Sequence, residues 1–82
     1  MVIRQVFRPN DEQYMGFEVE DASLAAPLPD IGDTIHWTAN KKSFSATVQS
    51  KTFSYEEDEI SLAQTRGWGV TITIIVNVVA VA

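Results

Sequence analysis

Hydrophobic and polar residues alternate most regularly over the last stretch of the chain, residues 69–82. One parity is apolar throughout and consists of Val70, Ile72, Ile74, Val76 and Val78. The other parity begins with threonines and turns apolar at Ile75, Val79 and Val81. Because successive side chains of a strand point to opposite faces, this pattern predicts a β-strand with one buried face and a second face that becomes apolar toward its end. An apolar strip that nothing covers is typical of an interface. We therefore expect the chain to associate with itself through Ile75, Val79 and Val81.

Four earlier segments also have the composition and the alternation of strands. They are residues 2–8, 14–20, 34–38 and 43–55. Turn residues at 9–12 and at 39–42 predict that the first two and the last two of these segments form hairpins. With the C-terminal strand this gives five strands, and residues 60–64 are either a short sixth strand or an extended loop.

The segment 43–55 changes its buried parity midway. Phe44, Ala46 and Val48 share one parity, whereas Phe53 and Tyr55 lie on the other. Such a change requires an irregularity in the strand, and we expect a β-bulge or a sharp coil at residues 49–51. A strand that buries its two parities in turn bends around a small barrel, so both aromatic residues after the bulge are expected to be buried.

The remaining segments are predicted to be irregular. Residues 21–29 predict a loop with at most one helical turn, because prolines within the segment would end a helix. Residues 56–59 are all acidic and predict a solvated turn. Residues 66–69 predict a flexible turn, in which two glycines flank Trp68.

The turn at residues 29–33 has a more specific chemistry. Gly32 permits a positive φ, and the Asp33 carboxylate can hold the turn. The pattern Pro-x-x-Gly-Asp-x-Ile, which ends at Ile35, resembles the turns that lead into strands of small SH3-like barrels, and this resemblance implies a fold but no activity. We therefore expect one all-β domain over residues 1–82: a five- or six-stranded antiparallel barrel or strongly bent sheet, SH3-like in general build.

The composition disfavours several classes of function. Six basic and eleven acidic residues give the 82-residue chain a net charge of −5, which disfavours binding to nucleic acid phosphates. The absence of cysteine excludes a disulfide framework and a thiolate zinc site, and it suits a reducing, cytoplasmic location. The C-terminal apolar run is shorter than the ~20 residues of a membrane-spanning helix, so no membrane insertion is expected.

The sequence offers little catalytic or metal-binding chemistry. His36 is the single histidine, and it shares the polar parity of Thr34 and Thr38. A general base needs an orienting partner and a metal site needs further ligands, and the pattern supplies neither. The acidic residues 56–59 lack the alternating ligands and the glycine of a calcium loop. We expect no cofactor, no metal and no enzymatic activity.

Two further groups of residues are candidates for binding a partner. Trp68 and its neighbour Arg66 stand beside glycines, and tryptophan is enriched at binding hot spots. An acidic docking patch for a basic protein would consist of Glu56, Glu57, Asp58 and Glu59.

These features favour a non-enzymatic protein-interaction module that associates with itself through the C-terminal strand, as a structural or adaptor protein of the kind frequent among bacterial and phage accessory proteins. One alternative is an acidic inhibitor or decoy that docks a basic host protein. Another is an oligomer that binds a small molecule in pockets between subunits, lined by Trp68 and Arg66. The three hypotheses require different surfaces, so the structure bears on each of them.

Overall fold

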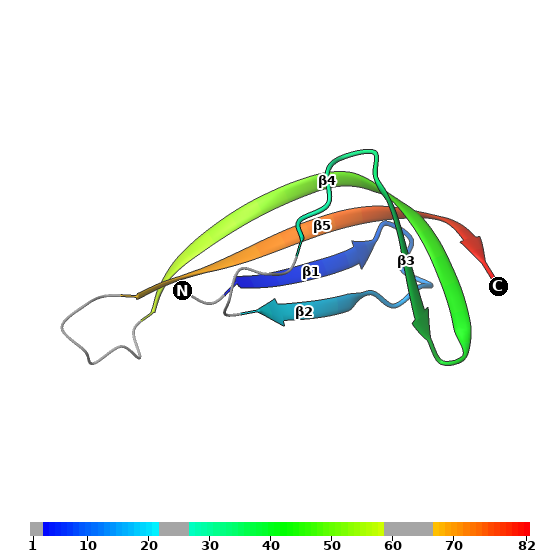
Figure 1. Ribbon diagram of the computed structural model, residues 1–82, viewed down its shortest axis with the longest axis horizontal. Coiled ribbons are helices and arrows are strands. Elements are labelled where there is room, and N and C mark those ends of the chain that lie inside the picture. The colour runs from blue at the N-terminus through cyan, green and yellow to red at the C-terminus, as the bar shows by residue number, and fades with distance from the viewer. Residues whose placement is uncertain (1–2, 22–26, 59–66) are drawn as a thin grey trace.

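The computed structural model describes residues 3–21, 27–58 and 67–82, which contain five strands and no helix (Figure 1). The strands are β1 (Ile3–Pro9), β2 (Phe17–Asp21), β3 (Thr34–Ala39), β4 (Lys42–Asp58) and β5 (Gly67–Val81). They form one sheet in the order β2-β1-β5-β4-β3. The all-β prediction is confirmed, as are the two predicted hairpins, β1–β2 and β3–β4. The possible sixth strand at residues 60–64 lies outside the described residues.

The middle strand of the sheet, β5, is parallel to its neighbour β1. Ile3 lies opposite Val70, and Pro9 lies opposite Val76. The other neighbouring pairs in the sheet are antiparallel, so the sheet is mixed and the prediction of a wholly antiparallel sheet is wrong at this pair. The physical reason is that alternation along a strand determines which face a side chain occupies but carries no information about the direction of the neighbouring strand.

The sheet curls into a half-barrel, with β3 lying across from β2 (Figure 1). Register shifts interrupt the β4–β5 pairing between Ser45 and Ala46 and again between Val48 and Ser50. The second shift confirms the bulge expected at residues 49–51, and bulges of this kind bend a strand. The predicted strong bend is confirmed. The sheet stays open between its two edge strands, and an SH3-like build is not confirmed.

The hydrophobic core lies on the concave face of the sheet. Its buried apolar residues are Phe7, Phe44, Ala46, Val48, Val70, Ile72, Ile74 and Val76. Ile74 and Val76 are completely inaccessible to solvent. The parity predicted to be buried in the C-terminal strand is therefore the core face of β5, which β1 and β4 flank on either side.

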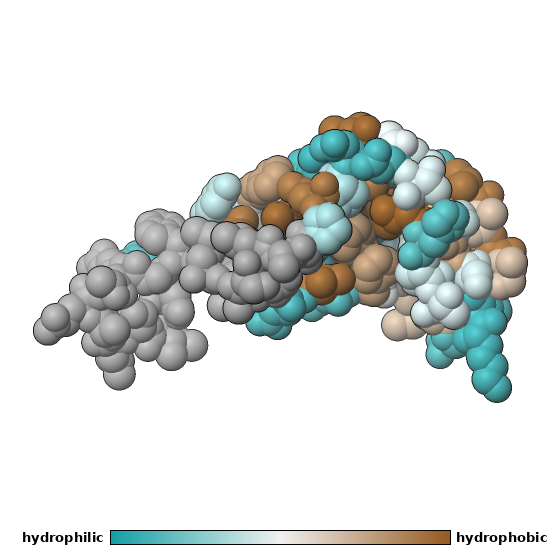
Figure 2. Space-filling view, in the orientation of Figure 1, coloured by the Kyte–Doolittle hydropathy of each residue, from teal (hydrophilic) through white to brown (hydrophobic). Residues whose placement is uncertain are grey.

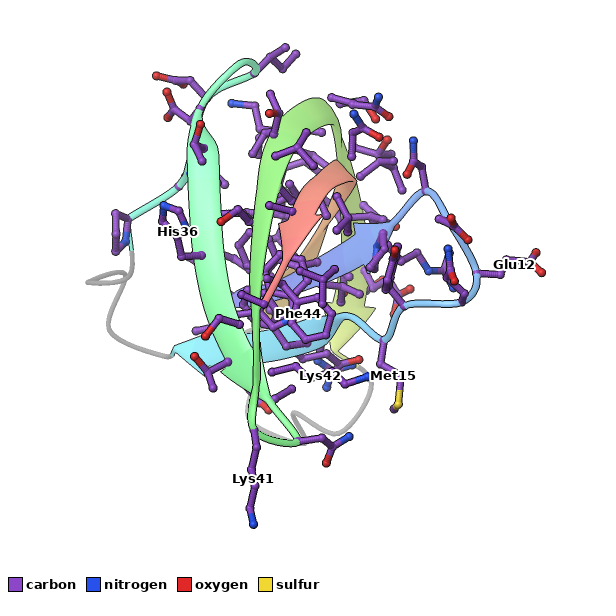
Figure 3. The ribbon with its side chains drawn as sticks, turned by 90° about the vertical axis from the view of Figure 1, so that its right-hand side faces the viewer. Glu12, Met15, His36, Lys41, Lys42 and Phe44 are labelled. Atoms are coloured by element: carbon purple, nitrogen blue, oxygen red, sulfur yellow. The ribbon has the colours of Figure 1, made fainter. Side chains whose placement is uncertain are left out.

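Aromatic side chains connect the two edges of the half-barrel. Phe17 of β2 stacks on Phe7 with ring centroids 4.4 Å apart and meets Trp37 of β3 at 5.3 Å. Trp37 in turn stacks on Phe44 at 5.1 Å, and Tyr14 approaches Phe44 edge-on at 6.0 Å. Phe44 lies among the side chains that fill the middle of the half-barrel in Figure 3. Ring contacts thus join β2 to β3 where the described strands do not pair.

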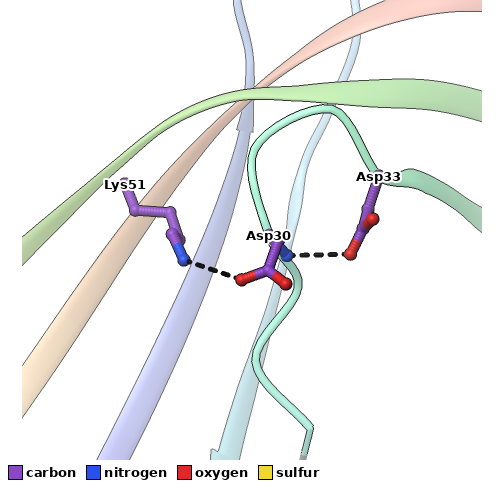
Figure 4. Close-up of polar contacts among 3 residues, drawn as sticks. All are labelled: Asp30, Asp33 and Lys51. Carbon is purple, nitrogen blue, oxygen red and sulfur yellow. Dashed lines mark hydrogen bonds and ion pairs between the residues drawn. The ribbon is translucent and has the colours of Figure 1, made fainter.

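Turns with special backbone geometry fix both ends of β3. The β3–β4 hairpin turns at Asn40 and Lys41, which have φ of 52° and 63°, as a type I′ turn requires. Before β3, Gly32 has a φ of 95°. The Asp30 N–H donates a 2.8 Å hydrogen bond to Oδ2 of Asp33 (Figure 4). The roles predicted for Gly32 and Asp33 are confirmed.

The half-barrel is longest in the direction of β4 and β5, which have 17 and 15 residues. The long axis follows β4 and β5, which form the arch in Figure 1. In the described part of the chain, no helix is long and apolar enough to cross a membrane.

Candidate functional site

β4 is longer than the strand beside it, and this leaves part of β4 without a described neighbour on one side. β3 pairs with β4 from Lys42 to Thr47, and the turn before β3 adds hydrogen bonds to Val48. Beyond the bulge, β5 is the only described strand that pairs with β4. We call residues 50–56 the free β4 edge. Backbone groups on such an edge can accept another strand.

Two aromatic side chains on the inner face of the free β4 edge are exposed. Lys51, Phe53 and Tyr55 pair with three core residues of β5, namely Ile74, Ile72 and Val70. Phe53 is nevertheless 45% exposed and Tyr55 62% exposed. The parity change predicted from the sequence is confirmed, but the burial predicted for both aromatic residues is wrong, because no described strand covers this end of the concave face.

Three of the four acidic residues at 56–59 belong to the strand and do not form the turn that was predicted. Glu56, Glu57 and Asp58 continue β4 and pair with residues 67–69 of β5. Because strand side chains alternate, Glu56 lies on the opposite face from Glu57, and the predicted acidic docking patch is divided between two faces. Glu59 lies outside the described residues.

Trp68 belongs to β5, where its register partner is Glu57. The flexible turn predicted at residues 66–69 is therefore wrong for residues 67–69, since the β4–β5 ladder extends to Gly67. The side chain of Trp68 and the whole of Arg66 lie outside the described residues. Their roles as binding residues stay predictions.

The C-terminal end of β5 also exposes apolar side chains. Val79 is 59% exposed and Val81 is 41% exposed, whereas Ile75 is half-buried. The register shift near Ser45 pairs Val81 with Phe44 and so turns Val81 away from the face that Val79 occupies. The predicted apolar strip of Ile75, Val79 and Val81 is therefore divided between two faces of the strand. Alternation within a β-branched run does not reveal a register shift, so the sequence could not predict this division. Hydrophobic residues accordingly reach the surface in separate places in Figure 2.

His36 lies on the outer face of β3 (Figure 3) and is exposed. Its Nδ1 is 2.8 Å from Oγ of Ser45 on β4, a cross-strand contact that ties the two strands together. Within the described ranges, no group of three or more His, Cys, Asp or Glu residues could hold a metal ion.

A shallow, open depression with a volume of about 620 Å³ lies where the turn after β1 meets β5. Its lining is mostly polar and consists of Asn10, Asp11, Glu12, Tyr14, Asn77 and Val78. Asn10 Nδ2 donates to Oδ1 of Asn77 (3.3 Å) and to Oε1 of Gln49 (3.4 Å). The side-chain amide of Gln13, and then its backbone N–H, donate to the Asp11 carboxylate and hold the pKa of Asp11 below its usual value.

This depression was not predicted, because Asn10 and Asn77 lie at opposite ends of the sequence. Its amides bond one another, and its open shape would enclose little of a small molecule. The small-molecule hypothesis places its pocket between subunits, beside Trp68 and Arg66, so this depression is a different feature and that hypothesis stays a prediction.

No protein-family model, no curated protein and no solved structure matches the chain. The fold and the exposed edges define a small all-β protein with an open, curled sheet. Its function has to be inferred from the residues that this sheet leaves uncovered.

Proposed function

We propose that the chain is a non-enzymatic protein-interaction module that associates with itself. The observation that carries this proposal is that large apolar side chains are exposed where strands lack described neighbours. These are Phe53 and Tyr55 on the free β4 edge, and Val79 and Val81 at the end of β5. Exposed apolar side chains beside unpaired backbone groups favour strand-to-strand association.

The distribution of charge favours the free β4 edge over the edge strand β2. Charged side chains on an edge strand discourage pairing with another chain, and β2 carries Glu18 and Glu20. The middle of the free β4 edge, residues 52–55, is uncharged. The division of Glu56 from Glu57 also supports self-association more than docking of a basic protein.

Size-exclusion chromatography with light scattering tests the proposal. We expect a mass that is a multiple of 9.1 kDa and that rises with protein concentration. A mass of 9.1 kDa throughout a wide concentration series would contradict self-association. The variant Val79→Asp tests the C-terminal end of β5 separately, since a charge there would lower the mass if that end forms the contact.

A further inference from the structure

We propose that two copies of the chain bind each other through the end of the half-barrel that carries Met15, around a two-fold axis beside this residue. This contact deepens the proposed self-association, on which it rests, by adding a second surface to the free β4 edge. A two-fold contact uses the same patch of both copies, so the patch has to be complementary to itself.

Exposed apolar side chains lie near Phe44 at this end of the half-barrel. Val81 is the register partner of Phe44 on β5 and is 41% exposed. Tyr14 approaches the Phe44 ring edge-on at 6.0 Å, and the next residue, Met15, is 75% exposed. Among the described residues, no large apolar residue is more exposed than Met15. Methionine is flexible and enriched at interfaces, so the Met15 patch, which consists of Tyr14, Met15 and Val81, provides the apolar centre of a contact.

Opposite charges flank the Met15 patch. The turn after β1 carries Asp11 and Glu12, and the β3–β4 hairpin carries Lys41 and Lys42, and all four residues are exposed. Met15 lies between Glu12 and Lys41 in Figure 3, and the side chains of both charged residues point away from the molecule. Within the part of the chain that the structure describes, neither lysine forms an ion pair, and Glu12 forms none. Their charges are therefore available to a partner.

A two-fold axis beside Met15 makes this arrangement complementary to itself. Rotation by half a turn exchanges the two sides of the Met15 patch, so the acidic turn of each copy meets the basic hairpin of the other. The Met15 side chains of the two copies meet at the axis, and each charge contact occurs twice. Opposite charges around an apolar centre speed association and fix its orientation.

The two-sided charge selects a second copy over a partner of one charge. A uniformly basic protein would meet Lys41 and Lys42, whereas a uniformly acidic protein would meet Asp11 and Glu12. Like charges that face each other across an interface are unfavourable. A second copy in the two-fold orientation sets unlike charges against each other on both sides of the Met15 patch.

The Met15 patch and the free β4 edge can act in the same molecule. Tyr14 contacts Phe44 near the start of β4, which begins at Lys42, whereas the free β4 edge begins at Ser50. β4 forms an arch between these two regions in Figure 1. A chain that uses both surfaces contacts two neighbours, so we expect the wild type to form assemblies of more than two copies.

Two charge-reversed variants and their mixture test this surface. Glu12→Lys sets like charges against the basic hairpin of the second copy. The double variant Lys41→Glu and Lys42→Glu sets like charges against the acidic turn. Each variant alone should associate through this surface about tenfold or more weakly than the wild type. In an equal mixture, an E12K copy can bind a K41E/K42E copy with opposite charges facing each other in both contacts.

The matched control is Glu18→Lys, which changes the net charge by the same amount as E12K. Glu18 is exposed on the outer face of β2, because its neighbours Phe17 and Val19 pack against the core. The E18K variant should have the mass of the wild type. Met15→Asp should have a lower mass that neither charge variant restores, and it should unfold like the wild type in dilute protein, because Met15 is 75% exposed.

Light scattering of all samples at the same protein concentration measures these masses. We expect E12K and K41E/K42E each to be lighter than the wild type, and their mixture to recover the wild-type mass. A mixture as light as the separate variants, separate variants as heavy as an oligomeric wild type, or an E18K control as light as E12K overturns the contact at Met15 alone. A wild type of 9.1 kDa at every concentration overturns self-association as well.

Discussion

Two phenylalanines on β4 differ in burial although they point to the same face of the same strand. Phe44 is 8% exposed and Phe53 is 45% exposed. Phe44 stacks on Trp37 of β3, whereas Phe53 lies beyond the point at which β3 stops pairing with β4. Burial on this sheet thus depends on which strands curl over a position as well as on parity. The covered end stabilises the fold, and we propose that the uncovered end binds a partner.

The largest effect is expected from breaking the covered end. F44A removes a buried ring that contacts Trp37 and Tyr14, and it should cost about 3–5 kcal/mol of the free energy of unfolding. F53A removes an exposed ring and should cost about 1 kcal/mol or less in the monomer. Urea denaturation of dilute protein measures both values, and an equal loss in the two variants would contradict the difference between the two ends.

Gly16→Ala, just before β2, should destabilise the covered end of the sheet. A methyl group at Gly16 would overlap the backbone carbonyl oxygen of Phe7, which cannot move aside as a flexible side chain would. We expect a loss of about 1–3 kcal/mol, measured by thermal unfolding. The neighbouring variant Met15→Ala is the control, because Met15 is 75% exposed and its loss should leave stability unchanged. A G16A variant as stable as M15A would contradict the close approach.

The turn before β3 contains two aspartates, which should contribute unequally to the free energy of unfolding. D33A removes the acceptor of the 2.8 Å hydrogen bond from the Asp30 N–H and should cost about 1 kcal/mol. D30A removes an ion pair to Lys51 from a largely exposed carboxylate and should cost about 0.5 kcal/mol or less. Urea midpoints of both variants test this order, and a larger loss in D30A would reverse the assignment.

A substitution at the tip of the β3–β4 hairpin should strengthen the covered end. Lys41 has a φ of 63°, a conformation that glycine adopts more easily than lysine. Lys41→Gly should therefore stabilise the protein by about 0.5–1 kcal/mol, and Lys42→Gly, one residue along in β4, should destabilise it by a similar amount. Thermal unfolding of both variants checks this prediction. Equal shifts of Tm with the same sign would argue against a type I′ turn.

The strands could be predicted from the sequence because the signals are local. The period of two in β5, the turn residues Gly32 and Asn40, and the parity change near residues 49–51 each depend on neighbours a few positions away. These signals fix which residues share a face and where a strand bends or ends.

The neighbours of each strand could not be predicted in this way. Most of the chain separates β1 from β5. Nothing in the sequence of either strand shows that the two strands lie side by side and parallel. The exposure of Phe53 follows from where β3 begins, because Thr34 is opposite Thr47 and nothing of β3 reaches further along β4. The division of Glu56 from Glu57 follows from the β4–β5 ladder, which continues to Gly67. The candidate site therefore emerged from strand pairing, which composition and alternation do not encode.

Light scattering of the wild type beside the variant Phe53→Asp most directly tests the central claim, that the uncovered end of the sheet binds a second copy. We expect the wild type to have a mass of twice 9.1 kDa or more. A charge at the exposed residue 53 should lower that mass and should change the free energy of unfolding of dilute protein by about 1 kcal/mol or less. A wild type of 9.1 kDa at every concentration, or an F53D variant with the same mass as an oligomeric wild type, would contradict the claim.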